Sequence, residues 1–543
     1  MRYRLPVRPR VCDYLQLPIR TSTAYVRRLN STVGWRFVIL MTSVYFGIKG
    51  TLGTFVGVGQ LPYFKEHLKV SGSEYQAYRT AAMTPWAMKA LMGAISDSIP
   101  IAGYFKRYYI VMASVVGTVA FLLLSTVQLS EGQEWIAALM FMMVHFEMAL
   151  VDLLCEGAYA AIMSKFAFSG SDIVTWVWTM VHSGGLLAAL VVGPLAKAGY
   201  IRGMFIICVP IAAQVAIPTL LGYLPEKRLP KNSRGPQIGK MLKHKKILLL
   251  AIGMAVAAMG LGICNMIAYE PLTLVYALTS STLMVVASFS VMPRNLALSN
   301  LFLFLLAASY INLGGALDYF YLADKECNPG GPQFDDVYYY TWSSIAQSVF
   351  GAVGVLFFQT FLSHWPFRRV FWVTVLLRGV AATVDIIIVN RWNLIIGISD
   401  KMMYMVGYNS LYQVIGMLEF MAAVVLTTKM CPKNIESTVY ALLAGFQNFG
   451  STVSSSIGVA MMNYFDIRTQ IPCDFTHLTT LIVISHMVLP LMCIPLTFVL
   501  LPDAYMTDTL NEHGELVRNH SNAGDSIELK SETNDDLDTD VYQ

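Results

Sequence analysis

The sequence predicts an all-α polytopic membrane protein with about fourteen transmembrane helices. Hydrophobic residues make up 55% of its 543 residues and charged residues only 13%, whereas a soluble globular protein carries about 25% charged residues. Apolar runs of about 20 residues recur along the chain, and each can cross a hydrocarbon layer of ~30 Å. A membrane β-barrel would instead show alternating segments of about 10 residues.

The apolar runs form a first group of six, a central pair and a last group of six. The first eight are expected at residues 36–58, 79–97, 108–128, 135–163, 175–196, 203–224, 247–268 and 272–292. The last six are expected at residues 297–322, 338–362, 370–389, 403–427, 438–465 and 476–501. The central pair could instead be re-entrant or interfacial, but each run is long enough to span. An even insertion also leaves the two groups of six with matching orientation.

Charge and hydropathy divide the chain into six expected segments. They are a basic arm (1–34), an N-terminal six-helix bundle (35–224), a basic segment (225–246), two inserted helices (247–293), a C-terminal six-helix bundle (294–501) and an acidic tail (502–543). Because basic residues concentrate in cytosolic segments, both termini are expected in the cytosol. The Arg-rich arm could instead be a transit peptide. The tail lacks apolar periodicity and is expected to be disordered.

The eight cysteines form no metal-binding or redox pattern, so the sequence predicts no metal and no cofactor. Cys327 and Cys473 both fall in loops expected outside the cell. A disulfide between them could form there, but the sequence does not show that they meet.

The fourth expected span holds the densest set of ionisable residues. His145, Asp152 and Glu156 lie within about 40° of one helical stripe. Charges inside a bilayer cost a few kcal/mol and usually face a cavity, so this stripe is suited to binding protons. Two carboxylates one turn apart repel when both are ionised, so one of them can hold a proton. The alternative is a static set of interhelical ion pairs.

Five more ionisable residues lie in other expected spans: Lys49, Lys89, Arg378, Asp385 and Glu419. The three cations could neutralise an anionic substrate, and the two carboxylates could line the same site. Alternatively, the three cations pair with Asp152, Glu156 and Asp385; Asp385 lies seven residues after Arg378, on the same face of the eleventh expected span. Both arrangements could hold in different conformations.

Two uncharged residues complete the candidate substrate site. Asn448 lies on a polar stripe of the thirteenth expected span and could form a hydrogen bond with a ligand ring. Trp86 could stack on an aromatic ligand, although interfacial and core packing explain most aromatic residues in such proteins.

The turn between the second and third expected spans combines small residues with charges. Gly93, Asp97, Gly103, Lys106 and Arg107 lie at the expected cytosolic face of the membrane. We expect them to act as a gate latch that holds one conformation and releases another, through contacts at helix ends and ion pairs. They are not expected to touch a substrate.

The sequence lacks the motifs of several other classes. It has no G-x-x-x-x-G-K-[ST] loop for ATP and no HExxH, CxxC pair or G-x-S-x-G motif. Its basic residues flank spans, which does not indicate nucleic-acid binding. A membrane enzyme would rest on His145 and Glu147 alone. A receptor would not need charges in several separate spans, so a transporter is the favoured interpretation.

Several blocks resemble known families. Gly93-x-x-x-Asp97 followed by a basic turn is similar to a loop signature of the major facilitator superfamily. The chain resembles the folate–biopterin transporter family, particularly its kinetoplastid members, at Pro85-Trp86, Lys89, Gly93, Ser96-Asp97, Pro100, Gly103-Tyr104 and Arg107-x-Tyr109. The acidic fourth span agrees, as does Cys431-Pro432-x-x-x-Glu436-x-Thr438-x-x-Ala441-Leu442. The sequence departs from the family at Ala90, commonly proline, and at Glu147, one place from the usual acidic position.

The resemblance implies a major facilitator-type fold: two six-helix bundles that work by alternating access, with two extra central helices. It implies proton-coupled import of folate, biopterin or a related pteridine across the plasma membrane. The expected partners are therefore a small-molecule substrate, protons and the lipid bilayer. Some relatives are thought to carry other metabolites, including S-adenosylmethionine. We expect Asp152, Glu156 and His145 to couple protons, and Lys49, Lys89 and Arg378 to meet the carboxylates of the substrate.

Overall fold

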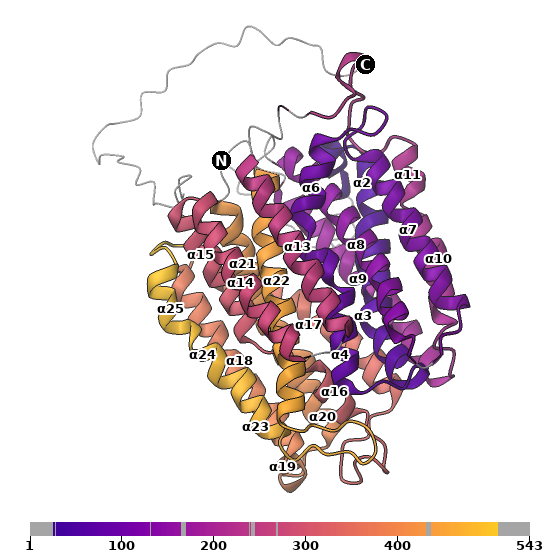
Figure 1. Ribbon diagram of the computed structural model, residues 1–543, viewed down its shortest axis with the longest axis vertical. Coiled ribbons are helices and arrows are strands. Elements are labelled where there is room, and N and C mark those ends of the chain that lie inside the picture. Colours follow the sequence, from indigo (N-terminus) through magenta and orange to yellow (C-terminus); the bar gives the residue numbers. More distant parts are fainter. Residues whose placement is uncertain are drawn as a thin grey trace, which may run out of the picture.

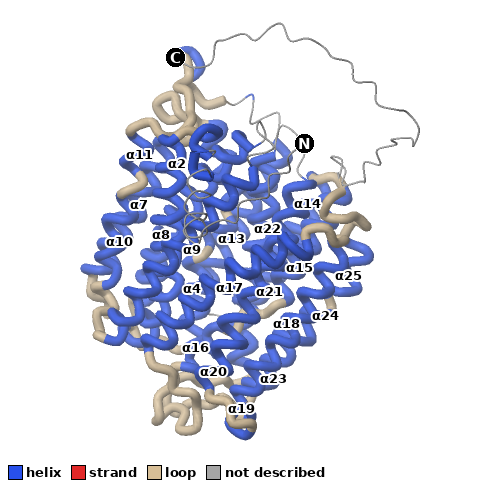
Figure 2. Tube along the Cα trace, turned by 180° about the vertical axis from the view of Figure 1, so that it is seen from behind, coloured by secondary structure: helices blue, strands red, loops and turns tan. Residues whose placement is uncertain are grey.

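The computed structural model describes residues 25–508 apart from residues 28, 131, 164–169, 238, 240–244, 268–269 and 431–435. The described residues are mainly helical and include no β-strand, only three isolated β-bridges. The helices lie side by side between two ends of the molecule (Figures 1 and 2). The basic arm before residue 25, the acidic tail after residue 508 and the Cys431-Pro432 pair lie outside the described residues.

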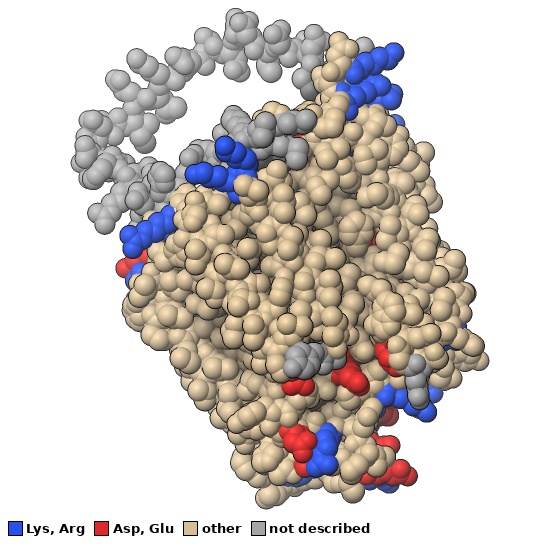
Figure 3. All heavy atoms as spheres, viewed as in Figure 1, with Lys and Arg blue, Asp and Glu red and all other residues tan. Residues whose placement is uncertain are grey.

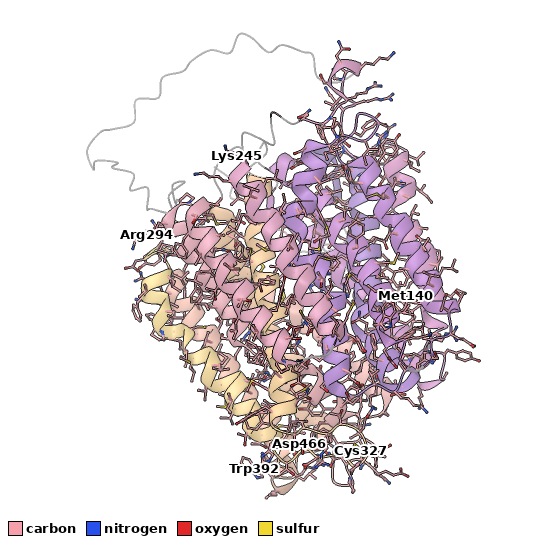
Figure 4. The ribbon with its side chains drawn as sticks, viewed as in Figure 1. Met140, Lys245, Arg294, Cys327, Trp392 and Asp466 are labelled. Carbon is pink, nitrogen blue, oxygen red and sulfur yellow. A yellow bond between two sulfur atoms is a disulfide. The ribbon has the colours of Figure 1, made fainter. Side chains whose placement is uncertain are left out.

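The two ends of the molecule carry different residues. Lys245 and Arg294 lie at one end, and Cys327 and Trp392 lie at the other (Figure 4). Cys327 and Cys473 form a disulfide with their Cα atoms 5.1 Å apart, so the pairing that the sequence left open is present. We call this end the disulfide end and the opposite one the basic end. Between them, the face in Figure 3 carries almost no charged side chains, as expected of a surface that contacts lipid.

The helices before residue 221 form the first group, which we call the N-half. They are α2 (Trp35–Thr42), η1 (Ser43–Leu52), α3 (Gly53–Pro62), η2 (Tyr63–His67), α4 (Gly72–Ala82), α5 (Thr84–Ala87), α6 (Lys89–Ser98), α7 (Arg107–Thr126), α8 (Glu134–Met163), α9 (Gly170–Lys197), α10 (Met204–Ala213) and α11 (Ala216–Leu220). The segments from α2 to η2 follow one another without a break and form one long apolar stretch.

The helices after residue 293 form the second group, which we call the C-half. They are α15 (Arg294–Ser309), α16 (Gly314–Tyr321), η5 (Val337–Trp342), α17 (Ser343–Phe357), η6 (Phe358–Leu362), α18 (Phe367–Val389), α19 (Trp392–Ile395), α20 (Asp400–Tyr404), η7 (Met405–Leu411), α21 (Tyr412–Met430), α22 (Glu436–Tyr464), α23 (Leu478–Ile482), η8 (Val483–Val488), α24 (Leu489–Leu491) and α25 (Cys493–Leu500). We call the contact surface between the two halves the seam.

Eleven helical stretches of the described residues are long and apolar enough to cross a membrane, and Met204–Leu220 is a shorter apolar stretch. The interrupted stretch α4–α6 and the 29-residue helix α22 are not among the eleven. The count of about fourteen spans therefore stays a prediction.

The second expected span begins earlier than its apolar run indicates. α4 starts at Gly72, where Ser71 and Glu74 form a capping box. The Ser71 hydroxyl accepts a hydrogen bond from the Glu74 N–H (3.3 Å), and the Glu74 carboxylate accepts one from the Ser71 N–H (2.8 Å). Gln76 and Arg79 lie inside this helix and interrupt the apolar pattern. This is why the predicted span began only at residue 79.

The two central helices cover the seam on one side. α13 (Lys245–Ile267) and α14 (Glu270–Val291) are 23 and 22 residues long and pack against each other and against α22, and α13 also packs against α4, α5 and α6. On α13, the Asn265 amide donates a hydrogen bond to the Ser456 hydroxyl of α22 (3.0 Å). Gly262 allows a close approach, since a Cβ there would lie 2.6 Å from the Thr84 Oγ1. The central pair therefore contacts both halves.

The seam is held together by backbone contacts at the disulfide end. α4 of the N-half packs against α16 and α22 of the C-half. A Cβ on Gly315 would lie 2.1 Å from the carbonyl oxygen of Gly72. The Gln76 amide donates hydrogen bonds to the carbonyls of Asn312 (2.8 Å) and Ser455 (2.9 Å), and its oxygen accepts one from the Gly315 N–H (2.9 Å). Only glycines can bring the two backbones this close.

Substitution of Gly315 by alanine should open the seam at the disulfide end. The added methyl group cannot fit against the Gly72 carbonyl, so the hydrogen bonds of Gln76 should be lost. We expect amide hydrogen exchange in residues 72–80 and 312–318 to rise about tenfold or more. Gly379→Ala is the control, because no atom lies within 4 Å of its Cβ position. Equal exchange in both variants would contradict this account of the seam.

Candidate functional site

A cavity of about 620 Å³ lies between the two halves. α4 and α5 supply its wall from the N-half, whereas α15–α18, α21, α22, η7 and η8 supply most of its lining from the C-half. Five of the predicted substrate residues line it: Trp86, Arg378, Asp385, Glu419 and Asn448. Lys49 and Lys89 do not. The cavity is therefore formed across the seam.

Arg378 and Glu419 form an ion pair in the cavity wall. Their nitrogen and oxygen atoms are 3.0 Å apart, and the side chains are 19% and 11% exposed. The guanidinium also lies 4.5 Å from the ring centroid of Tyr310, a cation–π contact. The second carboxylate oxygen of Glu419 is buried without a hydrogen-bond partner. Glu419 therefore uses one carboxylate oxygen to bind Arg378, and its other oxygen remains an unpaired hydrogen-bond acceptor.

Asp385 has a different partner from the one that helix spacing suggests. It lies seven residues after Arg378 on α18, but Arg378 pairs with Glu419 of α21 instead. The Tyr321 hydroxyl donates a hydrogen bond to the Asp385 Oδ1 (2.7 Å), whereas its Oδ2 is buried without a partner. Among the described residues, no cation lies within ion-pair distance of Asp385. It is a buried carboxylate without a counter-ion.

Trp86 links the cavity to the interior of the N-half. The Asn448 amide donates a hydrogen bond to the Trp86 carbonyl (3.0 Å), which joins α22 to α5 across the seam. The Trp86 indole N–H donates one to the His145 Nδ1 (3.1 Å), and the Lys89 ammonium lies 4.6 Å from the indole ring centroid. The Gln60 amide lies 3.3 Å from the other ring nitrogen of His145. His145 therefore contacts Trp86 and Gln60.

A charge cluster formed by Asp152, Lys49 and Lys89 lies next to Trp86 in the interior of the N-half. Asp152 of α8 accepts hydrogen bonds from Lys49 of η1 (2.9 Å) and from Lys89 of α6 (2.7 Å). The Asp152 side chain is only 3% exposed. Glu156 lies one turn further along α8 and is half-buried, with no cation within ion-pair distance among the described residues. Both lysines therefore pair with Asp152, and neither lines the cavity.

The expected latch lies in and around the α6–α7 turn. Gly103 adopts φ of +87°, a left-handed conformation that favours glycine, and its carbonyl accepts a hydrogen bond from the Leu229 N–H (2.9 Å). The Glu226 carboxylate accepts hydrogen bonds from the backbone N–H groups of Phe105, Lys106 (3.0 Å) and Arg107 (3.1 Å). The partial positive charge at the N-terminus of α7 favours a carboxylate at this position. Residues that follow the N-half therefore hold this turn.

The other two latch residues lie on α6. Gly93 faces α8, where a Cβ would lie 3.5 Å from the Leu153 Cδ2, and Asp97 is half-buried in the last turn of the helix. Sequence reasoning missed Glu226, although its place just before a run of basic residues was visible. The gating role of the five predicted residues stays a prediction.

Sequence reasoning also missed much of the cavity wall. The missed residues include Tyr75, Gln76, Arg79, Tyr310, Asp318, Gln347, Tyr408, Tyr412 and His486. In α4 the signal was present, because Tyr75, Arg79 and Met83 recur at four-residue spacing and share one helix face. The pattern was not recognised because the predicted span began at residue 79 and left Tyr75 outside it.

Removal of the Asp152 charge should destabilise the N-half strongly. Asp152→Asn leaves the buried ammonium group of Lys89 and the partly buried one of Lys49 without a counter-ion, which costs about 3–5 kcal/mol of the free energy of unfolding. The double variant Asp152→Asn/Lys89→Met should recover part of this loss. Thermal unfolding of the purified protein measures both effects, with Asp466→Asn at an exposed position as control. A single variant as stable as the wild type would contradict the assignment.

Comparison with known proteins matches most of the chain to one family and to relatives named as transporters. A family model described as the BT1 family matches residues 49–521. The "Probable folate-biopterin transporter 2" of Arabidopsis thaliana is 26% identical over 450 residues, which cover 82% of this chain and 80% of that protein. The "Folate-biopterin transporter" of Synechocystis sp. is 23% identical over 464 residues, which cover 84% and 80%.

Two solved structures illustrate the fold. A POT family transporter in complex with a thioalcohol-conjugated peptide has a TM-score of 0.63 at 13% identity, covering 86% of this chain and 97% of its own. A D-xylose–proton symporter has a TM-score of 0.51 at 11% identity, covering 88% and 98%. At such identities they show the fold alone. They confirm the predicted all-α, major facilitator-type fold class.

The family match extends over most of the chain and confirms the resemblance read from the sequence, whereas the likeness to kinetoplastid members in particular stays a prediction. The relatives' names indicate transporters rather than enzymes, as predicted. The chain therefore belongs to the BT1 family and is a multi-pass membrane transporter.

Proposed function

We propose that this protein imports folate, biopterin or a related pteridine across the plasma membrane by alternating access, driven by protons. The observation that carries the proposal is the cavity of about 620 Å³ across the seam, which combines the Arg378–Glu419 pair with aromatic rings. Its volume lies in the range of small-molecule sites, about 300–1,000 Å³. The family's printed names support the substrate class.

The lining of the cavity suits the two parts of such a substrate. A pteridine is a flat ring with hydrogen-bonding edges, and Tyr310, Tyr412 and Trp86 offer ring faces for stacking. The Asn448 amide could pair with a ring edge. The Arg378 guanidinium can exchange Glu419 for a carboxylate of folate, because a guanidinium binds carboxylates bidentately.

Movement of the halves about the seam would expose the cavity to each side in turn. The contacts at the disulfide end are short and local, centred on Gly72, Gly315 and Gln76, so a rocking motion could break them together. The α6–α7 turn, with Gly93, Asp97, Gly103, Lys106 and Arg107, would act as a latch at the basic end.

Glu156 is the best candidate for the proton-binding group. Asp152 already serves as counter-ion for Lys49 and Lys89, whereas Glu156 lies one turn away without a cation at ion-pair distance in the described part of the chain. A proton taken up there removes a like charge beside Asp152. His145 would act through its hydrogen bond with Trp86, which faces the cavity.

The proposed orientation has the basic end and both termini in the cytosol. Lys245 and Arg294 lie at this end, in line with the positive-inside rule. The printed name of one Arabidopsis relative includes "chloroplastic", so a fluorescent fusion should be used to locate the protein before uptake is measured.

A second candidate substrate is S-adenosylmethionine. Asp318 and Asp385 line the cavity, and neither has an ion-pair partner among the described residues. Carboxylates beside tyrosine rings would suit a sulfonium cation. This metabolite is therefore the comparison substrate in the experiment below.

Uptake of labelled folate, biopterin and S-adenosylmethionine should be measured in transport-deficient cells, with and without a protonophore. We expect the wild type to accumulate a pteridine, and the protonophore to abolish accumulation. Glu156→Gln should lower accumulation about tenfold or more while exchange of internal for external substrate continues, because only the proton-dependent step is lost. Glu326→Gln, in the loop beside the disulfide, is the matched control.

The two outcomes against the proposal are distinct. Background uptake of every pteridine by a correctly located wild type would reject the substrate class, and selective uptake of S-adenosylmethionine would establish the alternative. Full proton-dependent accumulation by Glu156→Gln would reject the coupling assignment alone.

A further inference from the structure

Arg79 is the cation that the N-half contributes to the cavity. It lies on α4 between Tyr75 and Met83, and all three line the cavity at four-residue spacing. The guanidinium of Arg378 comes from the opposite half. Among the described residues, one arginine from each half therefore lines the cavity.

The two arginines differ in their ionic partners. Arg378 pairs with Glu419 at 3.0 Å, whereas no carboxylate lies within ion-pair distance of Arg79 among the described residues. Asp318 of the C-half also lines the cavity, and it accepts a hydrogen bond from the Tyr339 hydroxyl (2.7 Å). A guanidinium remains charged at every physiological pH, and removing it from water without an anion is costly.

The cavity gives a ligand access to Arg79, which lines it from the N-half. Gly314 of the C-half lies close to Arg79, since a Cβ there would lie 3.2 Å from the Asn312 Oδ1 and 3.6 Å from both the Arg79 Nη1 and the Asp318 Oδ2. The aromatic rings of Tyr75 and Trp86 lie on the same N-half wall of the cavity. An anionic group with a flat ring attached to it would find complementary surfaces here.

We infer that Arg79 binds a carboxylate of the transported substrate. This rests on the proposed function and sharpens it, because it divides the substrates into two classes. A folate carries carboxylates and would contact Arg79 from the N-half and Arg378 from the C-half at once. Biopterin lacks a carboxylate and would depend on ring contacts alone. An anion that contacts both halves also draws them together, which couples its binding to the rocking motion.

The test compares folate with biopterin uptake in Arg79→Gln, Arg79→Lys and wild type at equal surface expression. Loss of a charge-assisted hydrogen bond should raise the KM for folate roughly ten- to hundredfold in Arg79→Gln. The KM for biopterin should change less than about threefold, which also shows that the variant folds. Arg79→Lys should recover part of the folate affinity, because it keeps the charge but loses the bidentate geometry.

Arg202→Gln is the matched control. Arg202 belongs to the same half, but its guanidinium donates hydrogen bonds to the carbonyls of Ser125 and Thr126 outside the cavity. An equal loss of both uptakes in Arg79→Gln would overturn the inference, as would unchanged folate uptake. Absence of all pteridine uptake in the wild type would reject the proposed function instead, so the two failures are distinguishable.

Discussion

The pairing of Asp152 with two lysines is the constraint on which the N-half depends. One carboxylate joins η1, α6 and α8, because Lys49 and Lys89 come from different helices and both reach it. Charges in a low-dielectric interior are stable only when they are compensated, so these three helices must keep their relative positions. Trp86 extends this arrangement to the seam, since Lys89 lies over its ring and Asn448 donates to its carbonyl. Direct contacts through Trp86 therefore link the charge cluster to the cavity wall.

The two halves meet through contacts of two kinds. At the disulfide end, Gly72 and Gly315 bring backbones together without side chains between them, and Gln76 adds three hydrogen bonds. In the cavity, the halves face each other with arginines, carboxylates and tyrosines that leave space for a ligand. Contacts of the first kind can only be made or broken as a whole, whereas the second kind can be replaced by a substrate. This difference is what an alternating-access transporter needs.

Several features of this arrangement were predictable from the sequence, because they depend on local pattern. Long apolar runs predicted the helices, and charges within those runs marked Asp152, Arg378 and Glu419 as candidate site residues, whose roles stay predictions. Ion-pair partners were predictable only in part. Asp152 was among the partners named for the cations and does pair with Lys49 and Lys89. The spacing of Arg378 and Asp385 places them on one face of α18, but Arg378 pairs with Glu419 of a neighbouring helix. Arg79 was missed because the predicted span 79–97 begins with it, so it looked like an ordinary charge at the end of a span. The capping box places the start of the helix at Gly72, which puts Arg79 well inside it.

In the proposed alternating-access cycle, the seam opens at the disulfide end each time a substrate is transported. Lys69 and Gln470 are exposed residues from opposite halves, and the Gln470 amide donates a hydrogen bond to the Lys69 carbonyl (2.8 Å). Cysteines at both positions can be joined by a short bismaleimide, which leaves the Cys327–Cys473 disulfide intact. We expect the joined protein to lose uptake, while each single-cysteine variant treated with the same reagent transports normally. Wild-type uptake by the joined protein would contradict the proposed cycle.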